Sequence, residues 1–190
     1  CVSRSQFPSE LYIQKVIFES DLTGTIENTS TFNNQLGGYQ DFTNLPNKAQ
    51  QYPGGIITVK AQGNHISRFK AWIDWNKSSS FEEPLELVYN SNGGVETTEF
   101  SFYIPESTSP GIYRIRIRNN YGIYFYGPGN PSSDYSFHMN FSSCEKFGNS
   151  TNMNYEGMIY YGESEDYEFE VLAPVSCYPP LISSATNITH

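Results

Sequence analysis

Apolar and polar side chains alternate with a period of two along most of this chain, which is the pattern of half-buried β-strands. The alternation marks residues 11–18, 55–61, 69–75, 85–89, 97–104, 111–118, 135–141 and 167–172. Polar clusters rich in Gly, Asn, Pro and Ser separate these segments, and no long stretch has the apolar period of a helix. The pattern predicts an all-β fold in which two antiparallel sheets pack as a β-sandwich of the jelly-roll or immunoglobulin-like type.

Composition and length agree with this expectation and indicate the domain boundaries. Aromatic residues make up 16% of the chain, and with β-branched residues they favour the pleated surface of a sheet. The 190 residues suit one large domain, which we place at residues 1–172. Residues 173–190 are expected to form a linker and the first strand of a following module. Because the chain begins with Cys1 rather than Met, we expect that a signal peptide or another domain has been removed from its start.

The charge of the chain excludes two kinds of partner. With a net charge of −9, the chain is repelled by phosphate backbones and by anionic lipid surfaces, so we expect no nucleic-acid partner. No apolar run approaches the ~20 residues of a membrane-spanning helix, so we expect no membrane insertion. Divalent cations are the more natural charged partners.

One predicted strand carries a row of basic side chains, and another carries a row of acidic ones. Successive side chains of a strand point to opposite faces, so each row lies opposite the apolar face of its own strand. If the two strands are neighbours, the rows will lie across from each other and form ion pairs. The basic row is Arg114, Arg116 and Arg118, and the acidic row is Asp166, Glu168 and Glu170.

An acidic turn precedes the acidic row and is the first candidate for a functional site. It places Glu163, Glu165 and Asp166 within four positions. Such a group serves structure, binds a metal or takes part in catalysis. The residues favour the structural use, in which Glu163 and Glu165 cap backbone N–H groups or pair with an arginine; a metal site comes next, and catalysis last.

Four segments in order resemble the motifs of the GEVED domain, a family named for the sequence Gly-Glu-Val-Glu-Asp. The ordered combination is specific, although each piece alone is weak, and the resemblance covers residues 1–172. Ser164 stands where the signature has Val. The segments are Gly-Tyr-Gln-Asp-Phe-Thr at 38–43, Trp-Ile-Asp-Trp-Asn at 72–76, Phe-Tyr-Ile-Pro at 102–105 with Gly-Ile-Tyr-Arg-Ile-Arg-Ile at 111–117, and Gly-Glu-Ser-Glu-Asp-Tyr at 162–167.

The resemblance implies a non-catalytic accessory module in a large secreted or surface protein of a bacterium. Such domains stand beside proteases, adhesins and fibronectin-like repeats. Cys1 and Cys144 lie where such domains often place two cysteines, which implies a disulfide between them in an oxidising, extracellular compartment. Cys177 is then expected to pair outside these residues. The segment from Cys177 onward resembles the opening strand of a fibronectin type III domain.

The same resemblance raises calcium as a candidate cofactor. Family members often carry a loop after the Trp-Ile-Asp-Trp-Asn strand that supplies several hard oxygens, as Ca²⁺ requires. The loop here retains Asp74, Asn76 and Glu86, but it has three serines at 78–80 and Lys77 beside them. The loss of carboxylates favours a polar turn without metal, and a retained calcium site at Asp74, Asn76 and Glu86 is the alternative.

The sequence offers little support for catalysis and more for ligand binding. The His residues are dispersed, and no nucleophile-elbow motif is present, so we expect no enzyme. Exposed aromatic rings stack on sugars or on peptide prolines, although alternating rings also commonly belong to a core. We therefore expect an adhesion module that binds an extracellular carbohydrate or protein; the alternative is a structural spacer, or an assembly unit of a surface fibre that contacts neighbouring subunits or domains. The ligand-binding candidates are Tyr121, Tyr124, Phe125, Tyr126, Tyr160 and Tyr161.

Overall fold

The computed structural model describes residues 4–7, 9–33, 37–121, 141–144 and 158–174. Every regular element in these residues is a β-strand, which confirms the all-β prediction. The same residues contain no helix long and apolar enough to cross a membrane. The strands are β1 (Arg4–Phe7), β2 (Ile13–Ser20), β3 (Ile26–Thr29), β4 (Tyr39–Asp41), β5 (Ala49–Gln51), β6 (Ile56–Ile73), β7 (Leu87–Asn90), β8 (Val95–Tyr103), β9 (Gly111–Tyr121), β10 (Met158–Tyr161) and β11 (Ser164–Val171).

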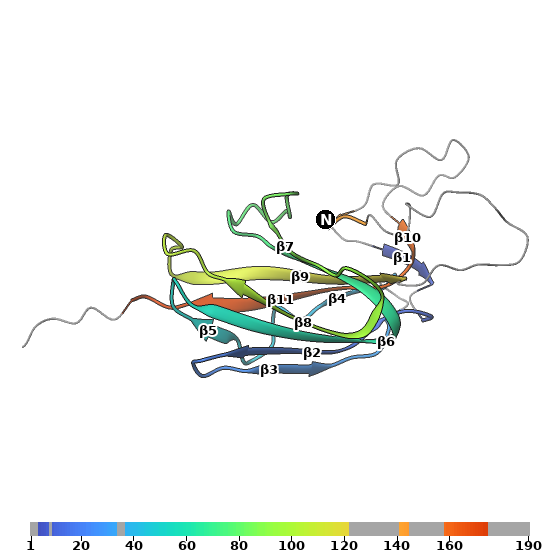
Figure 1. Ribbon diagram of the computed structural model, residues 1–190, viewed down its shortest axis with the longest axis horizontal. Coiled ribbons are helices and arrows are strands. Elements are labelled where there is room, and N and C mark those ends of the chain that lie inside the picture. The colour runs from blue at the N-terminus through green and yellow to red at the C-terminus, as the bar shows by residue number, and fades with distance from the viewer. Residues whose placement is uncertain (1–3, 8, 34–36, 122–140, 145–157, 175–190) are drawn as a thin grey trace, which may run out of the picture.

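Nine of these strands form one sheet, and the other two form a smaller one (Figure 1). The order in the large sheet is β3-β2-β6-β9-β11-β4; in addition, β5 pairs with β11, and both β7 and β8 pair with β6. Most pairs are antiparallel, but β4 and β5 run parallel to β11. The small sheet is the parallel pair of β1 and β10. The large sheet is therefore mixed and the small one parallel, whereas the alternation of the sequence predicts antiparallel pairs alone.

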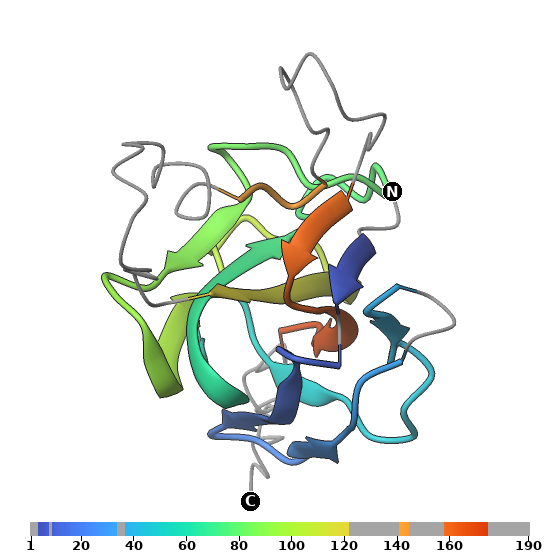
Figure 2. The ribbon, with the colours of Figure 1, turned by 90° about the vertical axis from the view of Figure 1, so that its right-hand side faces the viewer.

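The long strand β6 belongs to both halves of the large sheet. Its residues 56–62 lie between β2 and β8, and its residues 67–73 lie between β9 and β7. The strand bends between these two parts, as Figure 2 shows. A Cβ atom on Gly63 would lie 2.8 Å from both the carbonyl oxygen of His65 and Oγ of Ser67. A residue without a side chain therefore permits the close approach that the bend requires.

The two halves of the sheet face each other across the main hydrophobic core. The ring of Phe18 in β2 lies 5.3 Å from the ring of Tyr167 in β11, measured between centroids. The ring of Phe102 in β8 lies 5.1 Å from that of Phe169 in β11. Neither β2 nor β8 is hydrogen-bonded to β11, so the sheet must curl to bring these rings together. The structure thus shows a curled mixed sheet, and the specific sandwich topologies are not confirmed.

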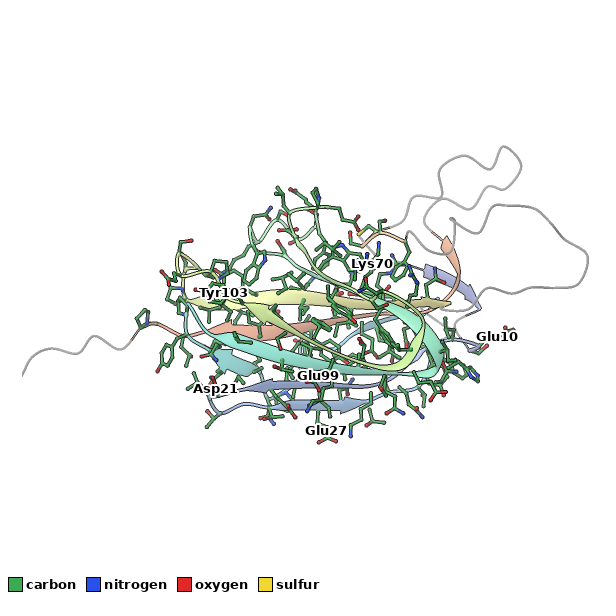
Figure 3. The ribbon with its side chains drawn as sticks, viewed as in Figure 1. Glu10, Asp21, Glu27, Lys70, Glu99 and Tyr103 are labelled. Carbon is green, nitrogen blue, oxygen red and sulfur yellow. The ribbon has the colours of Figure 1, made fainter. Side chains whose placement is uncertain are left out.

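A smaller apolar cluster lies on the outer face of the half that contains β9 and β11. Trp72 of β6 packs there against Phe141, with 6.3 Å between ring centroids, and Phe81 completes the cluster. Trp75 packs against the main core instead, so the two tryptophans face opposite sides, as expected. Figure 3 shows Lys70 on the same outer side as the coil that follows β6.

Differences between the predicted and observed strands have simple physical causes. The predicted segments 55–61 and 69–75 are both parts of β6, because the polar residues between them continue the strand. Alternation does not reveal β1, β3, β4, β5 or β10, which contain only three or four residues each. The predicted strand 135–141 falls outside the described residues except for Phe141, and the predicted start of a following module at 177–190 also falls outside them.

Candidate functional site

The acidic segment of the sequence forms the beginning of β11. This strand pairs with β9 on one side and with β4 and β5 on the other. The segment is extended from Ser164 onward, so most of the predicted acidic turn is strand. Alternation along β11 then separates its carboxylates: Asp166 lies on the outer face of the sheet, and Glu163 and Glu165 lie on the inner side, toward β2 and β3.

On the outer face, Asp166 forms an ion pair with Arg116, the residue opposite it in β9. Arg116 Nε donates to Asp166 Oδ1 at 2.6 Å, and Arg116 Nη2 donates to Asp166 Oδ2 at 2.8 Å. Asp166 is 0% exposed and Arg116 is 2% exposed. Two parallel hydrogen bonds of this kind fix both the distance and the orientation of the groups. The pairing predicted between the basic and acidic rows is therefore present at this position.

Two aromatic rings enclose the guanidinium group of Arg116. Its Cζ lies 4.7 Å from the ring centroid of Phe81 and 5.5 Å from that of Tyr39. Tyr39 also donates its hydroxyl hydrogen to Asp166 Oδ2 at 2.9 Å. Burial and the charge of Asp166 raise the pKa of Tyr39 well above its ordinary value, so its hydroxyl remains a donor. Tyr39 belongs to the 38–43 motif, so the fold brings two distant motifs into contact.

Three consecutive carbonyl oxygens before Cys144 accept hydrogen bonds from buried cations. Lys70 Nζ donates to the carbonyl oxygen of Phe141 at 2.7 Å. The next two carbonyl oxygens accept from Arg118 Nη1 and, at 3.1 Å, from Arg116 Nη1. Arg116 Nη1 also lies 3.4 Å from Sγ of Cys144. Hydrogen bonds from Lys70, Arg116 and Arg118 thus hold residues 141–143 against the outer face of the sheet, and we call this contact the clamp.

Farther along β11, the acidic side chains find partners other than arginines. Glu168 lies opposite Arg114 in the strand register, but its carboxylate forms an ion pair with Lys48 at 3.0 Å. Glu170 accepts a hydrogen bond from Gln50 Nε2 at 2.7 Å. Both partners come from the chain around β5, a strand that the sequence pattern does not reveal. The acidic row therefore fastens two different neighbours of β11.

On the inner side, Glu163 is buried among hydrogen-bond donors, with 1% of its surface exposed. It accepts from the backbone N–H of Ile13 at 2.8 Å and from Gln40 Nε2 at 2.6 Å. Its own backbone N–H donates to Asn119 Oδ1 at 2.8 Å. Burial, and then the charge of Glu165, raise the pKa of Glu163 to about 8. One of the structural uses predicted for this residue, the capping of a backbone N–H group, is thus present.

Glu165 is fully buried on the same side of the strand. Its Oε1 lies 2.7 Å from Ser30 Oγ, and its Oε2 accepts the hydroxyl hydrogen of Tyr167 at 2.7 Å. Tyr167 in turn accepts from Asn28 Nδ2 at 2.9 Å. Burial raises the pKa of Glu165 to about 7. The two glutamates therefore connect β11 to β2, β3 and β4 through uncharged groups.

The sequence analysis names Glu163 and Glu165 but does not predict that both are buried on the inner face of β11. A signal was available, because the period of two carried backward from Tyr167 places Glu165 and Glu163 on the apolar face. Their partners Ser30 and Gln40 offered no such signal, since they lie in or beside short polar strands.

The loop that carries the candidate calcium ligands forms a compact polar turn, which is the arrangement that the sequence favours. Asp74 Oδ1 and Oδ2 accept from the backbone N–H groups of Ser78 and Ser79, both at 2.9 Å. Asn76 Oδ1 accepts from the N–H of Ser78 at 2.8 Å. Lys77 and Ser79 have φ values of 57° and 66°, which residues other than glycine adopt infrequently. The hydrogen bonds to Asp74 hold the turn in this conformation.

Glu86, the third predicted calcium ligand, also binds backbone groups. It is 3% exposed and accepts from the N–H groups of Trp75 at 3.1 Å and Glu82 at 2.7 Å. Calcium requires six to eight oxygens that converge on one point. In the part of the chain that the structure describes, no three His, Cys, Asp or Glu side chains are grouped to hold a metal. The arrangement fits a hydrogen-bonded turn, and the calcium alternative remains to be tested by experiment.

We expect calcium to leave the melting temperature unchanged, and Asp74→Ala to lower the free energy of unfolding by about 1–3 kcal/mol. The loss arises because two backbone donors lose a charged acceptor. Thermal unfolding with calcium or with a chelator, and urea unfolding of the variant, measure the two effects. Asn76→Ala is the matched control, since Asn76 is exposed and accepts one bond. A calcium-dependent rise in melting temperature that Asp74→Ala abolishes would support the metal site instead.

The aromatic ligand-binding candidates and the predicted disulfide are only partly within the described residues. The structure places the backbones of Tyr121 in β9 and of Tyr160 and Tyr161 in β10. Cys1 lies outside the described residues, so the Cys1–Cys144 disulfide stays a prediction. The other three candidates also lie outside the described residues; they are Tyr124, Phe125 and Tyr126.

Comparison with known proteins gives one match. The model of a family described as the GEVED domain matches residues 68–170, which is over half of the chain. No curated protein and no solved structure matches significantly. The matched residues include Arg116, Asp166 and both inner glutamates, whereas β2, β3 and β4, which supply their partners, precede the matched range.

Proposed function

The chain belongs to the GEVED domain family, and from this premise we propose that it is a non-catalytic accessory module of a larger bacterial secreted or cell-surface protein. One observation carries the proposal: the carboxylates of the signature are buried and engaged by groups of the fold itself. Carboxylates engaged in this way are not presented to a substrate as an acid or a base. The signature thus serves to build the scaffold.

The scaffold that we propose is a β-sandwich suited to the extracellular space. The curled sheet supports this, because its two halves enclose one core. A disulfide between Cys1 and Cys144 would fasten the start of the chain and would contribute about 3–5 kcal/mol in an oxidising compartment. A fibronectin type III-like module beginning at Cys177 is the proposed neighbour.

We further propose that the module serves adhesion by binding a carbohydrate or a protein through aromatic side chains. A Cβ atom on Gly162 would lie 3.3 Å from Cα of Asn120, so the ends of β9 and β10 lie close together. Tyr121 follows Asn120, and Tyr161 precedes Gly162. The backbones of Tyr121 and Tyr161, which are distant in sequence, therefore lie near the same end of the large sheet. Loops at the end of a sheet often carry binding sites, and exposed rings stack on sugars and prolines.

Tyr124→Ala and Tyr126→Ala are each expected to weaken ligand binding by at least about tenfold. Tyrosines that become buried between two binding partners often contribute a large part of the binding free energy. The full chain would be tested on a glycan array and on immobilised collagen. Tyr103→Ala is the matched control, since Tyr103 is 51% exposed and ends β8, far from the end of β9 (Figures 1 and 3). Absence of binding by the native chain to all these ligands, or an equal loss in the control, would contradict the adhesion proposal.

A structural spacer is the second candidate function, and the edge strands favour it over a fibre-forming unit. Among the described strands, β3 pairs only with β2, and β8 pairs only with β6. Glu27 on β3 and Glu99 on β8 have side chains that are 61% and 64% exposed. Charged side chains at a sheet edge hinder pairing with another chain. A spacer should therefore remain monomeric in sedimentation experiments, whereas a fibre unit would assemble.

A further inference from the structure

Two oxygens, one of them in Glu165, compete for the single hydrogen of one hydroxyl group. Ser30 Oγ lies 2.7 Å from Glu165 Oε1 and 3.0 Å from the carbonyl oxygen of Ile13. A hydroxyl group has one hydrogen to donate, and a backbone carbonyl has none. Ser30 must therefore share its hydrogen between the two oxygens when Glu165 is ionised, and it makes a full hydrogen bond to each when Glu165 carries a proton and donates it to Ser30 Oγ.

The surroundings of Glu163 favour its ionised form, in contrast to those of Glu165. The backbone N–H of Ile13 and one N–H of Gln40 both point to its carboxylate, at 2.8 Å and 2.6 Å. The other N–H of Gln40 donates to the carbonyl oxygen of Thr31 at 2.8 Å. Two N–H donors stabilise the ionised form of a carboxyl group. When the pair holds a single proton, these contacts favour Glu165 as its carrier, whereas the pKa of Glu163, about 8, lies above that of Glu165, about 7; the two groups therefore titrate as a pair.

Among the residues that the structure describes, the groups that hydrogen-bond to the pair or to its backbone from the neighbouring elements are uncharged. They are the backbone of Ile13 from β2, Ser30 after β3, Gln40 from β4 and Asn119 from β9. The titratable group that joins them is Tyr167, and burial and the charge of Glu165 raise its pKa so that it stays protonated. On β9 and the adjoining part of β6, the buried cations belong to the opposite, outer face; they are Lys70, Arg116 and Arg118.

We propose that Glu163 and Glu165 form a proton-dependent clasp, which fastens β2, β3 and β4 to β11 while at least one of the two carboxyl groups is protonated. When both carboxylates are ionised, Ser30 loses the hydrogen that Glu165 donates. Two like charges then stand at positions i and i+2 on one face, where burial makes their repulsion strong. The clasp goes beyond the accessory role, because it makes the free energy of unfolding depend on the pH of the surroundings.

The clasp loosens as the pH rises toward mildly alkaline values. The pKa values of about 7 and about 8 both lie above the ordinary value of 4.5 for these groups. The stabilising contribution is therefore complete below about pH 4.5, declines as the pH rises, and is lost once the pH has passed through about 7 to 8. Within this window the equilibrium constant of unfolding should rise by up to about tenfold per pH unit for each proton held only by the folded chain.

Glu165→Gln separates the clasp from other effects of pH. The substitution keeps the shape of the side chain and supplies an N–H to Ser30, but it does not ionise. We expect it to reduce the pH dependence of the unfolding constant by up to about tenfold per pH unit and to make the chain more resistant to urea at pH 8 than the native one. Urea unfolding of the full chain between pH 5 and pH 9 measures both. Glu99→Gln, on the exposed face of β8, is the control and should keep the native slope.

An infrared measurement tests the proton directly, even if the Glu165→Gln variant folds poorly. The native chain at pH 6 should show the carbonyl stretch of a protonated carboxylic acid, which should vanish at pH 9 and persist at pH 6 in Glu99→Gln. Its absence from the native chain at pH 6 would overturn the proposal. Equal slopes of the unfolding constant against pH in the native chain and in Glu165→Gln would overturn it as well.

Discussion

Arg116→Met should lower the free energy of unfolding by about 3–5 kcal/mol, as measured by urea unfolding at neutral pH. The substitution leaves Asp166 with no exposed surface and without the two hydrogen bonds that Arg116 donates to it. Tyr39 would remain as a donor, but a neutral hydroxyl does not replace a positive charge. The same change also removes one hydrogen bond to the clamped segment before Cys144.

Two further variants show whether the buried charge is the cause of this loss. Arg114→Met is the matched control, because Arg114 lies in the same row of the same strand but is partly exposed. The double variant Arg116→Met/Asp166→Leu removes both charges and should recover much of the lost stability, since buried ion pairs are often replaced by apolar groups at little cost. Similar losses for Arg116→Met and Arg114→Met would refute the role assigned to the pair.

Gly162→Ala should lower the free energy of unfolding by about 3 kcal/mol. Gly162 has a φ of 108°, a conformation that favours glycine, and a Cβ atom there would lie 2.1 Å from the carbonyl oxygen of Asn119. The neighbouring backbone would have to move to relieve this overlap. The movement would disturb the bond from the N–H of Glu163 to Asn119 Oδ1 and would thus displace the inner pair.

Gly93→Ala provides the comparison for this prediction. A Cβ atom on Gly93 would meet no atom within 4 Å, so the change in unfolding free energy should stay within about 0.5 kcal/mol. Thermal and urea unfolding of both variants give the difference. If Gly162→Ala unfolds like Gly93→Ala, the close approach between Gly162 and β9 does not constrain the fold.

The features that could be predicted depend on neighbouring residues in the chain. Alternation placed Arg116 on the face opposite Tyr113 and Ile115, and it placed Asp166 opposite Tyr167, because side-chain direction in a strand is local. The pairing of β9 with β11 was a condition of the predicted ion pairs, and the structure supplies it. The motifs at 72–76 and 162–167 identified the family, since they combine particular residue types in a specific order.

The partners that could not be predicted come from segments with little local signal. Gln40 and Tyr39 lie in the three-residue strand β4, and Ser30 follows the four-residue strand β3. Strands this short show no clear alternation, and their parallel or edge positions depend on how the whole sheet curls. The hydrogen bonds to the segment before Cys144 could not be predicted either. Their acceptors are backbone carbonyl oxygens, which every residue type provides.

By itself, the sequence determined that the chain is all-β, that β9 and β11 carry rows of opposite charge, and that the chain has the motifs of its family. These properties follow from the period of two and from residue types at fixed spacing. Only the tertiary structure decided which carboxylates meet a charge and which meet uncharged groups. The bend in β6 brings β2 and β3 over the inner face of β11, so Asp166 is paired with Arg116 while Glu163 and Glu165 are buried without a cation among the contacts described. Burial in that position, and not residue type, raises their pKa values and makes them the proposed clasp.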